Sequence, residues 1–329
     1  MGLATTLRSL FAPPTIHRAA ILLIVGLLVA TVGACGLDNI EFVPDDEVLE
    51  EADDATEDRP PQRRFSTVAA GLFHTCALDQ RGRPVCWGLD VRGSIEPPSS
   101  RPLIELTSGL FHSCGLDAEG QPLCWGANTS GQIAAPEKTF IEISAGGAHT
   151  CGLDHEGEIT CWGADDNGQT QVPNGPFESV AAGGSHTCAL DRDDEPRCWG
   201  SNSHGQSSPP SGPLEAIDAG SIHSCGIDTG SGAVCWGGNG DRQSEPPAGY
   251  YDKISTGSAH SCAVERDGNA VCWGSDAHGR SSPPPGRFNT VTAGGSHSCG
   301  VDYDGFVVCW DSEYLEWATP DPRLLSRDE

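Results

Sequence analysis

The sequence contains one short unit seven times: His, then Thr or Ser, then Cys, nine further residues, and Cys-Trp. Successive units begin 38, 37, 37, 37, 37 and 37 residues apart. A period this regular is typical of repeat proteins, in which one supersecondary unit is copied and each copy stacks on its neighbours. Fourteen of the fifteen cysteines belong to these units, in the pairs Cys76/Cys86, Cys114/Cys124, Cys151/Cys161, Cys188/Cys198, Cys225/Cys235, Cys262/Cys272 and Cys299/Cys309.

The fifteenth cysteine, Cys35, follows a segment typical of a secretory leader. Arg8 and Arg18 precede an apolar run of about 14 residues, which is short for a membrane span of roughly 20, and small residues then lead to Cys35. The four residues that end at Cys35, Val-Gly-Ala-Cys, resemble the lipobox of bacterial lipoproteins. We therefore expect a signal peptide at 1–34 and lipidation of Cys35. The alternatives are an uncleaved anchor, or an ordinary signal peptide with an incidental Cys35.

Export has consequences for the other cysteines and for location. Disulfides persist outside the cytosol, so the even number of evenly spaced cysteines predicts seven disulfides, one in each unit. We expect the mature protein to be held on a bacterial membrane by its lipid, at the outer membrane or cell surface rather than the inner membrane.

Residues 35–63 are strongly acidic and contain few apolar side chains. Such a run cannot bury enough surface to order itself. We expect a disordered tether that precedes a repeat domain at 64–317 and a tail at 318–329. A docking segment for a basic partner is the alternative use of the tether.

The charge of the chain limits its partners. Removal of 1–34 takes away two arginines and no acids, which leaves 17 basic and 46 acidic residues and a net charge of −29. Binding to phosphates requires clusters of Lys and Arg. We therefore expect neither nucleic acid nor an anionic bilayer surface as a partner, apart from the lipid anchor.

The spacing within each unit predicts a β-hairpin with a fixed register. In the second unit, Asp117 and Gly120 bracket a three-residue turn with Gly in the left-handed conformation. Opposed residue numbers then sum to 238, so Cys114 faces Cys124 at a distance that a disulfide can span. Neither face of the hairpin shows a solvated polar alternation, which is expected of sheets packed radially on both faces.

Two units depart from the pattern at their turns or ends. The fifth unit has Ser231 in place of the turn glycine, and the glycines beside it predict a shifted turn. The seventh has Asp311 after its Trp, where the other six have Gly. At this end of the repeat, either Tyr314–Trp317 or the first strand, Phe65–Gly71, could complete the structure.

The repeated motif resembles the regulator of chromosome condensation repeat family. The clearest copies, residues 145–154 and 182–191, read Ala-Gly-Gly-Xaa-His-Thr-Cys-Xaa-Leu-Asp, and Cys-Trp-Gly, Gly-Gln and Pro follow them. The resemblance covers about residues 64–311. The repeats are of a short form, and the leader indicates that the protein is of a bacterial lipoprotein type. The resemblance implies an all-β fold, a seven-bladed β-propeller of about 37-residue repeats. An open solenoid is the alternative.

The family's nuclear founder binds chromatin and catalyses nucleotide exchange on a small GTPase. An acidic, exported lipoprotein is unsuited to both roles, so we carry over the fold and not these functions.

The repeated histidines are the sharpest candidates for chemistry. Histidine can ligate a metal or transfer protons, and with the cysteine pairs it could bind zinc. However, these side chains are copied seven times without a repeated carboxylate, which favours buried imidazoles that tie the backbone of one blade to the next. In the last unit, the register places His297 opposite Asp311 as a possible local site. The seven are His74, His112, His149, His186, His223, His260 and His297.

Two acidic runs and the tryptophans are weaker candidates for binding sites. Residues 165–167 and 191–195 could bind calcium, but neither follows the twelve-residue loop pattern closely, so solvated turns are expected. The tryptophans could stack on sugars. Small residues on the same side of the hairpin favour packing instead.

We therefore predict a monomeric, lipid-anchored β-propeller that binds another protein or a cell-surface glycan, without a cofactor, bound metal or catalytic residue. Loops that vary on a rigid scaffold, such as the turns between the paired cysteines, are where such a fold carries specificity. The alternatives are a metal-assisted hydrolase or lyase that uses the axial mouth of the propeller, and a structural protein of the envelope.

Overall fold

The computed structural model describes residues 63–98 and 101–310, and these form seven three-stranded antiparallel sheets. The chain divides into two units, Met1–Asp58 and Arg59–Glu329, and every described element lies in the second. Within the described ranges, no helix is long and apolar enough to cross a bilayer. The predicted leader, Cys35 and the tether up to residue 62 lie outside these ranges.

Each sheet consists of three consecutive strands in chain order. The first strands are β1 (Phe65–Ala70), β4 (Glu105–Ser108), β7 (Glu142–Ala145), β10 (Phe177–Ala182), β13 (Leu214–Ala219), β16 (Tyr251–Thr256) and β19 (Phe288–Ala293). The second strands are β2 (His74–Asp79), β5 (His112–Leu116), β8 (His149–Leu153), β11 (His186–Asp191), β14 (His223–Asp228), β17 (His260–Glu265) and β20 (Ser298–Asp302). The third strands are β3 (Pro84–Gly88), β6 (Pro122–Gly126), β9 (Ile159–Gly163), β12 (Pro196–Gly200), β15 (Ala233–Gly237), β18 (Ala270–Gly274) and β21 (Val307–Trp310). A 3₁₀ turn, η1 (Ala277–Gly279), is the remaining element.

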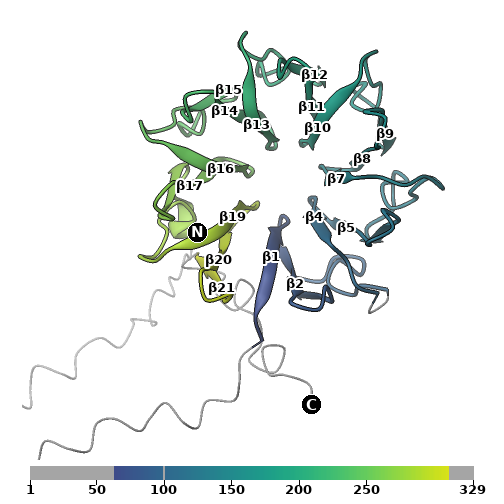
Figure 1. Cartoon of the computed structure of the whole chain (residues 1–329), viewed down its shortest axis with the longest axis horizontal. Coiled ribbons are helices and arrows are strands. Elements are labelled where there is room, and N and C mark those ends of the chain that lie inside the picture. Colours follow the sequence, from purple (N-terminus) through teal and green to yellow (C-terminus); the bar gives the residue numbers. More distant parts are fainter. Residues whose placement is uncertain (1–62, 99–100, 311–329) are drawn as a thin grey trace, which may run out of the picture. The chain divides into compact units, whose positions relative to one another are not determined.

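The seven sheets are the blades of a closed propeller. The first strand of each blade lies nearest the axis and contacts the first strand of the next blade, and β19 contacts β1 to close the ring (Figure 1). The expected all-β, seven-bladed architecture with one disulfide in each blade is confirmed.

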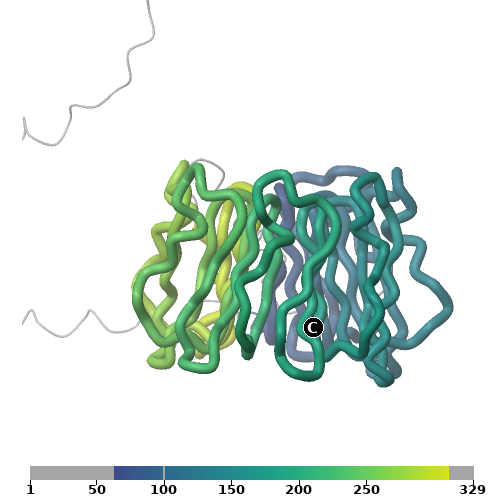
Figure 2. Tube along the Cα trace, turned by 90° about the horizontal axis from the view of Figure 1, so that it is seen from above, coloured from purple at the N-terminus to yellow at the C-terminus, as the bar shows by residue number. Residues whose placement is uncertain are grey.

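The strands run between two faces of the ring, as the side view shows (Figure 2). We call one the glycine face, because it carries the turns between the first and second strands, such as Gly71–Phe73. The other is the aspartate face, which carries the turns between the second and third strands, such as Asp79–Arg83. In the first six blades, the chain returns to the aspartate face after the third strand.

The predicted hairpin register is confirmed. Cys114 pairs with Cys124 in the ladder, and Gly120 takes a left-handed φ of 77° in the turn. The fifth turn, however, is not shifted, so that prediction was wrong. Cys225 still pairs with Cys235, and Ser231 adopts a φ of 65° where the other blades have Gly or Asp. The paired strands on both sides leave room for three turn residues only, so Ser231 must adopt the left-handed conformation.

A disulfide joins the second strand to the third in every blade. The seven bridges are Cys76–Cys86, Cys114–Cys124, Cys151–Cys161, Cys188–Cys198, Cys225–Cys235, Cys262–Cys272 and Cys299–Cys309, and each pair of Cα atoms is 3.9 to 4.1 Å apart. These are the pairs that the spacing of the cysteines predicts.

The two cysteines of a pair differ in how deeply they are buried, which the repeat motif alone does not indicate. The first cysteine of every pair is 0% exposed, because the second strand lies in the middle of its blade. The second cysteine lies on the outer strand and is less enclosed. Cys86 is 8% exposed, and the other six are half-buried: Cys124, Cys161, Cys198, Cys235, Cys272 and Cys309. Each disulfide therefore ties the outer strand of a blade to its buried centre.

The hydrophobic core lies at the borders between blades. One representative cluster joins Leu153 of the third blade to Phe177, Val180 and Ala189 of the fourth. The tryptophans belong to this packing rather than to an exposed platform. Trp125, for example, is 3% exposed, and its Nε1 donates to the carbonyl of Ser94 in the preceding loop.

A ring of seven backbone hydrogen bonds joins the blades around the axis on the glycine face. Each blade donates an N–H from the residue after its repeated glycine to the next blade, and Gly295 N donates to Gly71 O (3.0 Å) to complete the circle. A Cβ on any of these glycines, for example Gly109, would overlap the facing carbonyl oxygen of the next blade. This contact explains the repeated glycine.

Two segments were predicted as candidates to complete the structure at the seventh blade, and the first strand is the one that lies within the described residues. β1 packs on β19 and β20 of the seventh blade while it pairs with β2 of its own. The ring therefore closes by packing between whole blades. The other candidate, Tyr314–Trp317, lies outside the described residues.

Candidate functional site

The seven repeated histidines form a ring of hydrogen bonds between blades. In each blade, the imidazole Nε2 lies within hydrogen-bond distance of the Ser or Thr hydroxyl that precedes the first cysteine of the next blade. The bond from His297 to Thr75 joins the seventh blade to the first (2.6 Å). The other bonds are His74–Ser113 (2.9 Å), His112–Thr150 (2.9 Å), His149–Thr187 (2.9 Å), His186–Ser224 (2.8 Å), His223–Ser261 (2.8 Å) and His260–Ser298 (2.7 Å).

The hydroxyls fix the tautomer of five of these histidines, His112, His149, His186, His223 and His260. Thr187 Oγ1, for example, donates its hydrogen to the carbonyl of Gln169 (2.9 Å), so its bond to His149 must use a hydrogen from Nε2. The opposite nitrogen, His149 Nδ1, is then an unprotonated acceptor, and it is buried without a hydrogen-bond partner. The prediction of a buried imidazole that ties blades together holds, although its partner is a hydroxyl and not the backbone.

Burial makes these imidazoles poor proton acceptors. It lowers the pKa of His149 from 6.5 to about 4 and that of His112 to about 3, where the neighbouring histidines add to the effect. The pKa values of His74 and His223 fall to about 4, and those of His186 and His260 to about 3. Neutral imidazoles used as fixed donors have a structural role in this arrangement.

The other predicted metal candidates are also engaged in the fold. All seven cysteine pairs, from Cys76–Cys86 to Cys299–Cys309, are disulfides, so they offer no thiolate for zinc. Asp311, the predicted partner of His297, lies outside the described residues. Across the part of the chain that the structure describes, no group of three or more His, Cys, Asp and Glu could hold a metal ion.

Both acidic runs close turns. Asp165 accepts the N–H of Thr170 and the side-chain amide of Gln171, each at 3.0 Å. Asp191 accepts the backbone N–H of Asp193 and pairs with Arg197 Nε (2.7 Å). Their oxygens are used within the turn, as the solvated-turn interpretation predicted.

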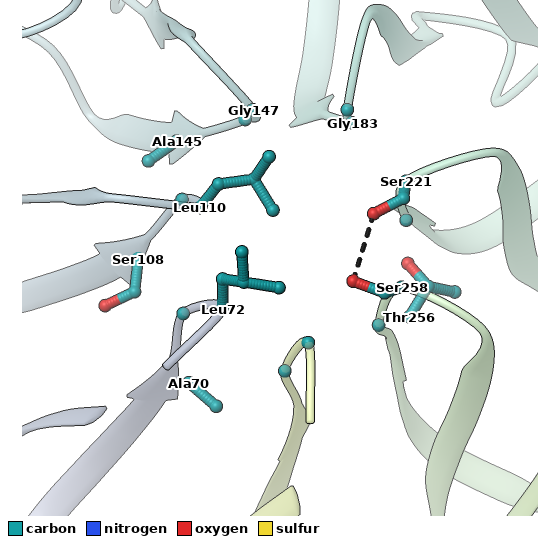
Figure 3. A pocket seen from close by; sticks show the side chains of 18 of the residues that line it. Ala70, Leu72, Ser108, Leu110, Ala145, Gly147, Gly183, Ser221, Thr256 and Ser258 are labelled. Carbon is teal, nitrogen blue, oxygen red and sulfur yellow. Dashed lines mark hydrogen bonds between the residues drawn. The ribbon is translucent and has the colours of Figure 1, made fainter. Parts of the chain in front are cut away.

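The axial pocket on the glycine face is small and uncharged. It has a volume of about 70 Å³ and is lined by the Ala-Gly-Gly segments and their equivalents from all seven blades. Leu72 and Leu110 project into it from one side, and a hydrogen bond joins Ser221 to Ser258 on the other (3.2 Å) (Figure 3). The pocket is far below the roughly 300 Å³ of common ligand sites. It presents backbone groups, hydroxyls and small apolar side chains, and no side chain that titrates near neutral pH.

The first strands carry buried carboxyl groups that sequence reasoning missed. Each first strand has a free edge, and side chains from the preceding blade accept its N–H groups. Glu105 accepts the N–H of Ile143 (3.1 Å), and Asp218 accepts that of Thr256 (2.6 Å). Glu142 accepts the N–H of Val180 in the same way. Alignment of the repeats on their glycine could have revealed these residues, because Ser, Thr, Ala or Lys stands at the equivalent positions.

These carboxyls are poorly solvated. Burial raises the pKa of Glu105 to about 7. Burial, together with the charge of Glu105, raises the pKa of Glu142 to about 8. Burial also raises the pKa of Asp218. Each group serves as a buried acceptor for a backbone N–H, which explains an acid at this position without catalysis.

Exposed apolar side chains gather on the aspartate face. Ile104 is 69% exposed and Tyr250 65%, and Ile141 and Tyr303 are about half exposed. All four stand just before a first strand or in an aspartate-face turn, at positions where most other blades carry different residues. On the glycine face, Leu89 is the exposed large apolar residue of the described part of the chain. The aspartate face is therefore the candidate binding surface.

We expect the histidines to make the propeller sensitive to acid. The folded pKa values of six of them, His74, His112, His149, His186, His223 and His260, lie below 6.5. The unfolded chain therefore binds more protons, and stability falls as the pH drops from 6.5 towards 4. Each histidine contributes about 1.4 kcal/mol per pH unit in that window. His149→Gln keeps an Nε2 donor without titrating, so the pH slope of the free energy of unfolding should decrease by about one proton. Urea unfolding at several pH values measures it, with the exposed His204→Gln as the control. An unchanged slope in His149→Gln would contradict the assignment.

Glu142 should have the opposite pH dependence. Its folded pKa is raised, so the folded state holds a proton that the unfolded state releases above pH 4.5, and stability is lost as the pH rises from 4.5 to 8. Glu142→Gln keeps an acceptor for Val180 and cannot ionise. We expect this variant to be more stable than the parent at pH 8, by on the order of 2 kcal/mol, with little difference at pH 4.5. The exposed Glu178→Gln in the next blade is the matched control, and a gain that is equal at both pH values would refute the explanation.

Comparisons with known proteins agree with this architecture. The profile of the Regulator of chromosome condensation (RCC1) repeat matches residues 65–94, 104–132, 140–169, 177–206 and 251–280, which are blades 1 to 4 and blade 6. No curated protein matches the chain significantly.

Several solved structures share the fold. The ectodomain of the receptor kinase CR4 from Physcomitrella patens is 28% identical with a TM-score of 0.66, over 76% of this chain and 74% of that one. The CRINKLY WD40 ectodomain of the Arabidopsis thaliana receptor kinase ACR4 is 28% identical with a TM-score of 0.63, over 77% and 99%. Prp20p from Saccharomyces cerevisiae, studied for its binding to Gsp1p and histones, is 18% identical with a TM-score of 0.61, over 77% and 84%.

The profile matches five of the seven blades, and the blades share the hydrogen bonds that the repeated residues make. Five of the seven blades are therefore repeats of the regulator of chromosome condensation (RCC1) family.

Proposed function

We propose that this chain is a protein-binding module that uses the aspartate face of its propeller and is held at the cell envelope by a lipid on Cys35. The observation that carries the proposal is that four of the five exposed large apolar side chains of the described residues lie on that face. The repeated His, Ser, Thr and Trp side chains all bond or pack within the scaffold. Exposed, non-repeated residues such as Ile104 and Tyr250 are left for recognition.

Two further observations support binding outside the cytosol. The related structures with 28% identity are ectodomains of receptor kinases. Seven disulfides also suit an oxidising compartment. An exposed site of mixed apolar and polar character fits a protein better than a glycan, because Ile104 and Ile141 offer no hydrogen bonds to sugar hydroxyls.

The choice of face can be tested by photocrosslinking in cells that produce the full chain. A benzophenone amino acid replaces Ile104 or Tyr250 on the aspartate face, and Leu89 on the glycine face is the matched control. We expect discrete protein adducts from the first two positions and few from Leu89. Equal adducts from both faces would contradict the face assignment. Adducts that a glycosidase removes and a protease leaves intact would favour the glycan alternative.

Membrane attachment depends on Cys35 in this proposal. We expect Cys35→Ala to lose incorporation of a labelled fatty acid and to leave the membrane fraction, while the parent chain retains both. Propeller folding should persist in the variant, since every disulfide partner lies elsewhere. Fatty-acid labelling that continues in Cys35→Ala would rule out the lipidation site.

A further inference from the structure

Six of the seven turns on the aspartate face begin with an aspartate, and blade 6 has Glu265 there. In the first four blades, this aspartate is paired with a cation. These aspartates follow the second strand, or end it, in the repeat. In each case the cation comes from the same blade as the aspartate. The pairs are Asp79–Arg83 (2.8 Å), Asp117–Arg101 (3.1 Å), Asp154–Lys138 (2.6 Å) and Asp191–Arg197 (2.7 Å).

In the fifth blade, the same carboxylate, Asp228, lacks this cation. The cations of the other blades come from three positions of the repeat, and blade 5 has a small or apolar residue at each. Gly232 stands where blade 1 has Arg83, Gly212 where blades 2 and 3 have Arg101 and Lys138, and Val234 where blade 4 has Arg197. Among the described residues, Asp228 forms no ion pair.

Asp228 is nevertheless held as its counterparts are. Its Oδ1 accepts the N–H groups of Gly230 (2.8 Å) and Gly232 (2.9 Å). In blade 2, Asp117 Oδ1 accepts the two equivalent N–H groups, and its Oδ2 then faces Arg101. The turn of blade 5 thus orients a carboxylate for a cation that its own blade does not supply.

Asp228 lies in a pocket of about 610 Å³ between blades 5 and 6. The pocket is bounded by the glycine-rich turn on one side and by residues 246–250 on the other. The buried Tyr251 fixes this second wall, because its hydroxyl donates to the carbonyl of Pro247 (2.9 Å). Tyr250 adds an exposed ring. A preformed pocket of this kind reduces the entropy lost when a side chain enters it.

Arg266, which contacts the same turn, is already engaged. Arg266 Nη2 donates to Ser231 Oγ (2.6 Å), its guanidinium lies 5.5 Å from the centroid of the Tyr250 ring, and its Nε is 3.8 Å from Asp252. It therefore braces Tyr250 and the turn and does not neutralise Asp228.

The seventh blade provides a comparison. Asp302 also has no ion pair among the described residues, but Phe306 occupies the position of Arg83. The guanidinium of Arg64 lies 5.7 Å from the centroid of that ring. A chain cation thus stands over this turn, whereas the pocket in blade 5 is open.

We propose that the pocket at Asp228 binds an arginine side chain of a partner protein, with the guanidinium on the Asp228 carboxylate and the alkyl part against Pro247 and Tyr250. The inference rests on the proposed protein-binding function and names one anchor of its partner. Three of the four cations that fill the equivalent site within this chain are arginines. Arginine also combines a planar fork for a carboxylate with stacking on an aromatic ring.

The test uses the full chain labelled with ¹⁵N-glycine and titrated with N-acetyl-arginine amide. The uncharged isostere N-acetyl-citrulline amide is the control ligand. We expect the arginine probe to shift the Gly230 and Gly232 amide resonances, with an apparent affinity about fivefold higher than that of the citrulline probe. Asp228→Asn keeps the acceptor for both N–H groups and should lose this preference.

A second variant fills the site from within. Val234→Arg places an arginine where Arg197 stands in blade 4, and it should abolish the response to the probe. Val271→Arg, the same change in blade 6, should leave the response intact. Shifts that are absent in the parent chain, or that persist unchanged in Asp228→Asn or Val234→Arg, would overturn the assignment. Because the titration needs no partner, its failure would leave the photocrosslinking test of protein binding unaffected.

Discussion

The propeller depends on one hydrogen bond that is repeated at every border between blades. At each border an imidazole is hydrogen-bonded to a hydroxyl of the next blade, and in blades 3 to 7 that hydroxyl donates onward to a loop carbonyl, so the imidazole is the donor there. The same carbonyl accepts the indole N–H of the tryptophan next to the second cysteine in these blades, as Gln169 O does from Trp199. A buried polar group without a partner costs about 1 to 3 kcal/mol, so His, Ser or Thr, and Trp must be present together. This coupling explains why the sequence unit repeats as a whole.

The strands, their register and the disulfides could be predicted from the sequence, because the same spacing occurs seven times. Cys114 opposite Cys124 follows from a single spacing, and seven copies support it. The fifth turn was mispredicted because Gly230 and Gly232 suggested more freedom than the paired strands allow, and Ser231 took the left-handed conformation. The backbone-hydrogen-bonded carboxyls stand out only when the repeats are aligned, because they replace Ser, Thr, Ala or Lys at single positions. The open pocket could not be predicted from a motif, because it depends on a cation that is missing beside Asp228.

The proposed binding residues lie where the repeat is broken. Residues that recur in every blade are engaged in holding the ring, and this includes the histidines that looked most suited to chemistry. The axial pocket, which the enzyme alternative would use, is lined by glycine, small residues and two leucines. By contrast, Tyr250 and the fifth turn differ from their counterparts in the other blades, and the isoleucine at position 104 recurs only in blade 3, as Ile141. All of them lie on the aspartate face. The profile of the family also matches neither blade 5 nor blade 7.

The way in which the ring closes has a consequence for the order of the chain. β1 joins the seventh blade through the same types of bond that join any two neighbours, such as Gly295 N to Gly71 O and His297 to Thr75. No strand is exchanged between the first and last blades among the described residues. The location of the chain ends is therefore not required by packing. A circular permutant opened in another inter-blade loop would keep every blade intact and every neighbour unchanged.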